Sequence, residues 1–135
     1  MGTPATSTTP VCNKSESLDS LFMAKLAAGQ AEEKKGAGTV ILDVGQVTSL
    51  ADFFVITGGD SANQVKAIAD AIVQALAKHG FYPGAIEGQR DGRWVLLDFG
   101  VVIVHVLKEQ ERNYYKLEKF WNQALVVDRK SWEGK

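Results

Sequence analysis

Residues 43–59, DVGQVTSLADFFVITGG, decide the fold of this chain. A β-branched run, TVILDV at 39–44, leads into this stretch, and a second apolar run, FFVIT at 53–57, lies within it after a short polar turn. Runs of this composition favour strands, and their continuous apolar character indicates burial on both faces. The stretch therefore predicts two buried strands joined by a turn.

Apolar residues at helical spacing flank these two strands. Residues 18–35 and 61–79 are both predicted helices, because their large apolar residues recur every three or four positions. Gly36 follows the first, where glycine commonly ends a helix. Ser61 and Gln64 form a capping-box pattern at the start of the second.

The second half of the chain predicts, in order, an edge strand, a hairpin of two strands and a last helix. In order, the expected elements are strands at 82–87, 93–99 and 101–107 and a helix at 109–121. The middle strand alternates, with Trp94, Leu96 and Asp98 on one face. We therefore expect an α/β fold of the two-layer α+β kind, with a mixed sheet of about five strands flanked by helices.

Length and composition fit one globular domain. The chain has 135 residues, 45% of them hydrophobic, and a formal net charge of −1. We expect a single domain at 18–122 between a flexible tail at 1–17, rich in Ser, Thr and Pro, and a loose polar tail at 123–135. Within the second tail, residues 125–127 could add an edge strand.

Several classes of protein are disfavoured. No apolar run approaches the ~20 residues of a membrane span, and the near-neutral charge gives no general attraction to DNA or to anionic lipid. The single cysteine, Cys12, rules out an internal disulfide and a zinc ribbon. One cysteine and no secretory signal favour a reducing, intracellular compartment. The N-terminal tail is short and lacks the arginines of a transit peptide, so we expect the cytoplasm. We expect neither a membrane nor DNA as a partner.

The GGDS turn at 58–61 is a candidate phosphate-binding site, because a glycine-rich helix start can bind phosphate through free backbone N–H groups. A nucleotidyltransferase also needs paired carboxylates on the adjoining strands to hold a divalent metal. Asp43, Asp52 and Asp98 are separated in sequence, although a sheet could bring two of them together. A lone His105 in a β-branched strand favours a packing role over a general base. We therefore predict no catalytic residue, no cofactor and no metal site.

The last predicted helix carries an aromatic stripe. At helical spacing Tyr114, Leu117 and Trp121 share one face, among charges of both signs. Such a stripe packs into a core, or it anchors a partner where aromatics are exposed and ringed by charge. The spacing leaves both interpretations open.

Six strings match one family in order: LDV, TSLADFFVITGG, SANQVKAIADAI, EGQRDGRWVLLDFG, VVIVHVLKEQER and YYKLEKFW. Together they resemble the ribosomal silencing factor family (RsfS, also called Iojap-like) from about Leu18 to Trp121, whereas the two tails match nothing specific. The residues at the family's characteristic positions are Ser49, Asp52, Trp94, Asp98, His105, Tyr115, Leu117, Glu118 and Trp121. The resemblance implies a fold similar to that of nucleotidyltransferases but without their catalytic carboxylates.

The resemblance also implies a function. Members of the family bind the large ribosomal subunit through its protein fourteen, block joining of the small subunit and repress translation when nutrients are short. The hairpin and the last helix would form the partner-binding face, with Trp94, Asp98, Tyr114, Tyr115, Leu117, Glu118 and Trp121 on it. Val101 departs from the family pattern, which usually has an acidic residue at this position after the DFG-type turn.

Two alternatives from other classes stay open. One is a small nucleotidyltransferase-like enzyme, which bound metal beside Asp43 and Asp52 would indicate. The other is an RNA-binding ribosome assembly factor, which steep salt dependence of binding would indicate. A homodimer is also left open.

Overall fold

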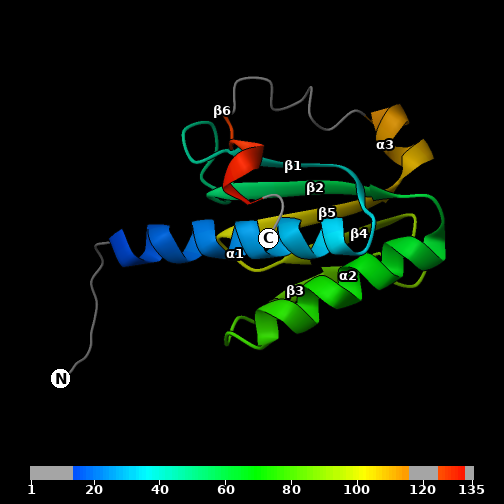
Figure 1. Ribbon diagram of the computed structural model, residues 1–135, viewed down its shortest axis with the longest axis horizontal. Helices are drawn as coiled ribbons and strands as arrows, with labels where there is room; N and C mark the ends of the chain where they lie inside the picture. Colours follow the sequence, from blue (N-terminus) through cyan, green and yellow to red (C-terminus); the bar gives the residue numbers. More distant parts are fainter. Residues whose placement is uncertain (1–13, 116–124, 133–135) are drawn as a thin grey trace.

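The computed structural model of the protein describes residues 14–115 and 125–132. This part of the chain forms a six-stranded sheet with helices packed on it (Figure 1). In chain order the elements are α1 (Lys14–Glu33), β1 (Ala37–Asp43), β2 (Phe53–Gly59), α2 (Ala62–Ala77), β3 (Ala85–Glu87), β4 (Trp94–Asp98), β5 (Val102–Lys108), α3 (Glu109–Tyr115), β6 (Leu125–Val126) and the 3-10 helix η2 (Arg129–Ser131).

The sheet is mixed, in the order β3-β4-β5-β2-β1-β6. Strands β2 and β5 run parallel, whereas β1 with β2 and β4 with β5 are antiparallel pairs. The predicted hairpin and the predicted α+β class with a mixed sheet are confirmed. The sheet has six strands rather than about five, because the short β6 joins β1 at Leu42 and Asp43.

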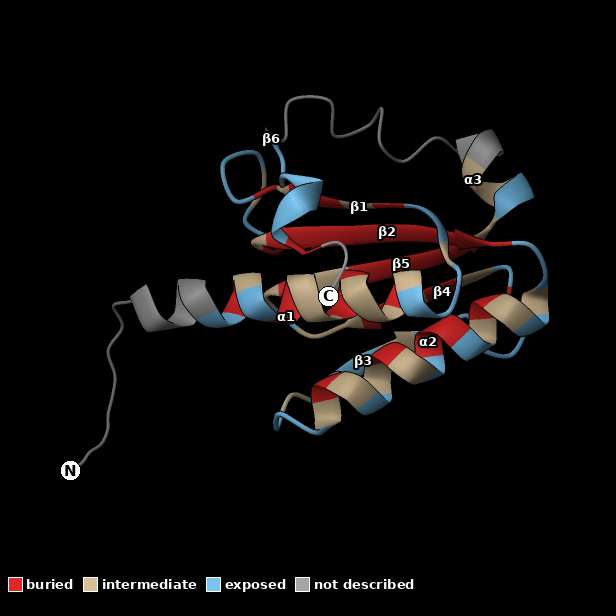
Figure 2. Ribbon diagram, viewed as in Figure 1, coloured by how far each residue is buried: buried red, intermediate tan, exposed pale blue. Residues whose placement is uncertain are grey.

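Helices α1 and α2 lie on the same face of the sheet and form its covering layer (Figure 1). Every residue of β2 is buried, and Figure 2 shows this strand red along its whole length. The main core joins α1 and α2 to alternate strand residues, including Ile41, Val55, Val95 and Val104. This period of two follows from the strand geometry and leaves the intervening residues on the opposite face.

Helix α1 is longer at its start and shorter at its end than the predicted helix at 18–35. It begins at Lys14, inside the segment predicted as a tail, and ends at Glu33. Lys35, rather than glycine, takes the left-handed conformation after the helix, with φ of 66°. Gly36 donates its N–H to the Ala31 carbonyl at 2.7 Å, and a Cβ at Gly36 would meet that carbonyl and the Thr57 hydroxyl. Glycine is needed there for close approach, not for its backbone angles.

The start of α2 confirms only part of the predicted capping box. The Ser61 hydroxyl accepts from the Gln64 N–H at 3.1 Å, as expected. The Gln64 side chain, however, accepts from the Asp60 N–H at 2.6 Å, and donates to the carbonyls of Lys34 and Lys35 at 3.3 and 3.1 Å. Gln64 therefore joins the start of α2 to the end of α1.

The C-terminal segment corrects a second expectation. Residues 125–132, predicted as part of a loose tail, are ordered against the domain, and the suggested edge strand is present as β6. Trp132 is only 3% exposed and belongs to the core beneath α1. Arg129 fixes this segment through a 2.9 Å ion pair with Glu32 and a hydrogen bond to the Thr39 carbonyl at 3.1 Å. Residues 1–13 and the predicted helix beyond Tyr115, up to Trp121, lie outside the described residues.

The buried Trp132 makes the C-terminal segment part of the stability of the domain. Trp132→Ala should lower the free energy of unfolding by about 3 kcal/mol, because it removes a large buried side chain and leaves a cavity. Urea unfolding followed by fluorescence or circular dichroism measures the change. Tyr82→Ala is the matched control: Tyr82 is 69% exposed, so its loss should change stability by less than ~0.5 kcal/mol. Equal effects of the two variants would contradict the buried role of Trp132.

Candidate partner-binding face

The face of the sheet opposite α1 and α2, here termed the second face, carries the predicted site residues of β4. Leu96 lies beside His105 of β5, which in turn lies beside Ile56 of β2. The next row toward the hairpin turn holds Asp98 and Ile103. The predicted alternation is confirmed, since Val95 and Leu97 belong to the core under the helices.

Exposure changes across the second face from β2 to β4. Phe54 and Ile56 of β2 are buried in a small cluster with Leu42 and Leu107. Trp94 and the remaining outward residues of β4 are only half-buried. Leu96 belongs to neither core cluster, although its side chain is apolar. The β4 side of this face is therefore a half-exposed apolar surface, and Ile103 of β5 and Val40 of β1 on the same face are also only partly buried.

Trp94 and His105 form a polar contact within this apolar surface. The Trp94 indole N–H donates to His105 Nδ1 at 3.2 Å, and the two rings lie 6.1 Å apart. On its other side His105 meets Phe54 edge-to-face, with ring centroids at 5.2 Å. His105 thereby positions Trp94, so the predicted packing role of the histidine agrees with its contacts.

Burial lowers the pKa of His105 from 6.5 to about 4, so the imidazole is neutral at pH 7. Because Nδ1 accepts a hydrogen bond, the single proton of the neutral ring belongs on Nε2. Nε2 is buried and has no hydrogen-bond partner among residues 14–115 and 125–132. Neither Asp98 nor Glu87, the partners considered for a general base, bonds to this ring in the described part of the chain.

Asp98 shapes the hairpin turn. Its Oδ1 accepts from the Gly100 N–H at 2.8 Å, and Gly100 has a positive φ of 88° that favours glycine. The side chain of Val101 packs against the core under the helices, and its carbonyl accepts from the N–H groups of Asp52 and Phe53 at 2.8 and 3.2 Å. The residue that departs from the family pattern therefore lies away from the second face.

The carboxylates that an enzyme would need are at the wrong end of β2. Asp43 and Asp52 both border the β1–β2 loop, where a Cβ at Gly45 would lie 3.6 and 4.0 Å from their oxygens. The glycine-rich turn at 58–61 begins at the opposite end of β2, about 20 Å away at ~3.3 Å per residue. Within the described ranges no three His, Cys, Asp or Glu side chains come together as metal ligands.

The structure describes only part of the predicted last-helix site. Tyr114 and Tyr115 lie in α3, directly after β5, but their side chains are outside the described part, as are Leu117, Glu118 and Trp121. The described Arg112 donates to the Ala37 carbonyl at 2.9 Å and attaches α3 to β1. No local pattern predicts this contact, because it joins residues 75 positions apart.

His105 should give the domain a specific loss of stability in acid. The unfolded histidine binds a proton below pH 6.5, but the folded one binds it only below about pH 4. The unfolded state therefore holds more protons between these values, and the free energy of unfolding falls as pH drops through this window, by on the order of 3 kcal/mol in total. Urea unfolding at pH 7, 5.5 and 4.5 measures the slope.

His105→Gln is the comparison for this measurement, since glutamine keeps an acceptor for the Trp94 indole but does not titrate. The carboxylates contribute equally to both proteins, so the difference between the two slopes isolates the histidine. We expect a shallower slope in the variant between pH 6.5 and 4.5. Parallel slopes would show that the imidazole is not buried in its neutral form.

Comparison with known proteins identifies a family model and relatives that match most of this chain. The family model described as "Ribosomal silencing factor during starvation" matches residues 16–134. A Bacillus subtilis protein named ribosomal silencing factor RsfS is 39% identical over 104 residues, which cover 77% of this chain and 88% of that protein. The match to residue 134 corrects the expectation that the C-terminal tail resembles nothing specific, in agreement with the packed Trp132.

Solved structures agree with the sequence comparison. A crystal structure of a Chromobacterium violaceum protein superposes with a TM-score of 0.74 at 37% identity, covering 76% of this chain and 85% of that one. A crystal structure of a Bacillus halodurans protein gives a TM-score of 0.71 at 36% identity, covering 80% of this chain and 98% of that one. From the family match and these relatives, the chain belongs to the ribosomal silencing factor family.

Proposed function

We propose that the protein binds the large ribosomal subunit through its protein fourteen, blocks association with the small subunit, and so represses translation in the cytoplasm when nutrients are limiting. Family membership supports this role. The observation that carries it is the half-exposed strip on β4, in which Trp94, Leu96 and Asp98 lie side by side on the second face. In this proposal the strip docks on the ribosomal protein.

The strip has the composition of a protein interface. Trp94 is half-exposed but held in place by its bond to His105, so little side-chain freedom remains to be lost on binding. Leu96 offers apolar area beside it, and Asp98 places a carboxylate at the end of the strand. Aromatic anchors surrounded by apolar and polar neighbours are typical of binding hot spots. Tyr114, Tyr115, Leu117, Glu118 and Trp121 would extend this face in the proposal.

The proposed activity is binding without catalysis. Asp43 and Asp52 lie at the far end of β2 from the 58–61 turn, so they cannot hold a metal against a phosphate bound there. The Ser61 hydroxyl is already engaged as the cap of α2, and Asp60 would repel an anion at the same place. No described helix is long and apolar enough to cross a membrane.

Leu96→Glu tests the proposed face with little risk to the fold, because Leu96 is half-exposed and belongs to neither core cluster. The protein should co-sediment with free large subunits and not with small subunits. The variant should lose at least tenfold in affinity for large subunits and for purified protein fourteen, since a buried charge without a partner would replace an apolar contact. Sedimentation of the protein with purified subunits, followed by titration with protein fourteen, measures both.

Tyr82→Ala is the matched control, an exposed apolar side chain removed from another part of the surface. It should bind as the unchanged protein does, and both variants should keep the normal circular dichroism spectrum. If Leu96→Glu binds normally, the β4 strip is not the docking face. Sedimentation with small subunits, or with neither subunit, would overturn the function itself.

The absence of catalysis has its own test. Isothermal titration of the protein with ATP and magnesium should give no binding in the micromolar range, because the carboxylates stand apart from the glycine-rich turn. Micromolar binding that is abolished by Asp43→Asn or Asp52→Asn would favour the nucleotidyltransferase-like alternative.

A further inference from the structure

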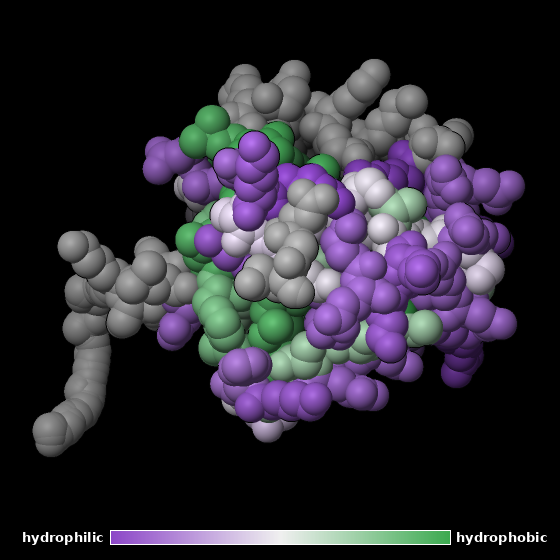
Figure 3. Space-filling view, in the orientation of Figure 1, coloured by the Kyte–Doolittle hydropathy of each residue, from purple (hydrophilic) through white to green (hydrophobic). Residues whose placement is uncertain are grey.

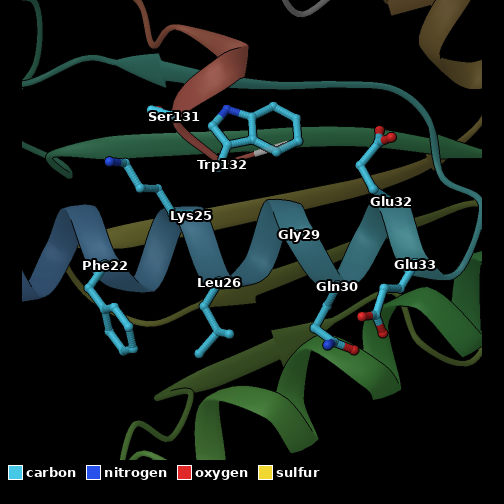
Figure 4. A pocket seen from close by; sticks show the side chains of 9 residues that line it. All are labelled: Phe22, Lys25, Leu26, Gly29, Gln30, Glu32, Glu33, Ser131 and Trp132. Carbon is cyan, nitrogen blue, oxygen red and sulfur yellow. The ribbon is translucent and has the colours of Figure 1, made fainter. Parts of the chain in front are cut away.

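A small hollow, here termed the α2 hollow, lies between α2 and the sheet edge formed by β3 and β4. Its volume is about 140 Å³, against about 470 Å³ for the groove along α1 that Figure 4 shows. In Figure 3 hydrophobic residues gather over the left part of the face that α1 occupies, whereas hydrophilic residues cover most of the right part. The α2 hollow differs from that apolar surface, because its apolar residues lie beneath charged ones.

The floor of the α2 hollow is apolar. Val95 and Leu97 of β4 are fully buried, and Val73 of α2 and Ile86 of β3 stand beside them, half-buried. Ile86 lies opposite Leu97 in the antiparallel pair of β3 and β4. A cavity of about 150 Å³ lined by apolar side chains can hold a molecule of the size of benzene. The floor is therefore large enough for a branched aliphatic group.

Charged side chains stand at the mouth of the hollow. Lys66 and Asp70 are one helical turn apart on α2, so about 6 Å separates their positions along the helix. Neither forms an ion pair with the other or with any other residue of 14–115 and 125–132. A lysine that precedes its acidic partner by four residues is the weaker order for such a pair. The mouth therefore offers an ammonium group and a carboxylate side by side.

The loop at 88–92 completes the rim and restrains Lys66. The Gly92 N–H donates to the Gly88 carbonyl at 3.0 Å, which closes the loop, and Gln89 within it lines the hollow. A Cβ on Gly92 would lie 2.9 Å from Lys66 Cε, so the stem of Lys66 runs against the bare Gly92 backbone. The string EGQRDG at 87–92, to which the second face gives no role, thus contributes to the α2 hollow.

We propose that the α2 hollow binds a small aliphatic α-amino acid such as leucine. The side chain of the ligand fills the apolar floor, its carboxylate accepts from the Lys66 ammonium group, and its own ammonium group donates to the Asp70 carboxylate. An α-amino acid carries both charged groups on one carbon atom, so it satisfies both charges of the mouth at once. A ligand with a single charge would leave either Lys66 or Asp70 without a partner.

This site is separate from the proposed ribosomal contact. Val95 and Leu97 belong to the core under the helices, whereas the outward residues of the same strand form the β4 strip on the second face. A ligand in the α2 hollow therefore leaves the strip uncovered. So small a ligand binds weakly, with a Kd on the order of 1 mM, and the measurement has to reach millimolar concentrations.

Titration of the isotopically labelled full chain with L-leucine, followed by NMR of the backbone amides, tests the site. The amide signals of Ala69, Gly92 and Leu97 should shift together as leucine is added. Isocaproate lacks the ammonium group, isoamylamine lacks the carboxylate, and glycine lacks the aliphatic side chain. Each of these probes should bind more weakly than leucine by about tenfold or more, because each leaves one part of the hollow unmatched.

Lys66→Met and Asp70→Asn test the two charges. Each removes one partner of a charge-assisted hydrogen bond, so each should weaken leucine binding by about tenfold. Lys25→Met and Glu33→Gln are the matched controls, because they make the same changes of charge in the groove along α1 (Figure 4). Both controls should bind leucine as the unchanged protein does, and all four variants should keep the normal circular dichroism spectrum.

The proposal is overturned if no amide signal at the hollow shifts up to about 20 mM leucine, or if isocaproate or isoamylamine binds as tightly as leucine. It is also overturned if Lys66→Met and Asp70→Asn, correctly folded, bind leucine normally. The titration needs no ribosome, and both variants should sediment with large subunits as the unchanged protein does. Failure of the amino-acid site and failure of the ribosomal role are therefore separately visible.

Discussion

The parallel pairing of β2 with β5 is the constraint on which the rest of the structure depends. The two strands stay in register from Phe53 and Val102 to Gly59 and Lys108, so the chain must cross over between them. Parallel strands cannot be joined by a tight turn, and here α2, β3 and β4 make up the crossover. A parallel pair is apolar on both faces and needs cover on both. Helices α1 and α2 supply it on one side, whereas the β4 side of the second face stays half-exposed in the described structure, and this is the surface on which the proposed partner would dock.

The features that could be predicted from the sequence are those that depend on local periodicity. The alternation at 93–99 placed Trp94, Leu96 and Asp98 on one face because a strand side chain has only two directions to take. The capping serine and the apolar strands follow from equally local rules. The start of α1 was missed because its first turn is polar, and its end was misjudged because Lys35 adopts a conformation that glycine usually takes.

The features that were missed depend on contacts between distant parts of the chain. Trp132 stands alone in a polar segment, and only its packing under Arg129 and against the main core shows that this segment belongs to the fold. Leu96 was also not among the residues that the family resemblance implied for the partner-binding face. Its role in the candidate site follows from the structure, in which it is a half-exposed apolar residue opposite His105. For the candidate site, sequence thus located the strand and its outward residues, while the degree of exposure of each side chain required the assembled sheet.

His105 connects the stability of the sheet with the chemistry of its exposed strip. A partner that covers Leu96 and Trp94 would remove water from the surroundings of this histidine, and burying a charged imidazolium there would oppose binding. The ring is already neutral at pH 7, because its pKa is about 4 before any partner arrives. Docking on the β4 strip therefore requires no proton to be released from His105, and binding through this face is independent of that titration throughout the neutral range. In the proposed complex, the same burial of His105 that makes the domain sensitive to acid would also keep the imidazole neutral in the contact.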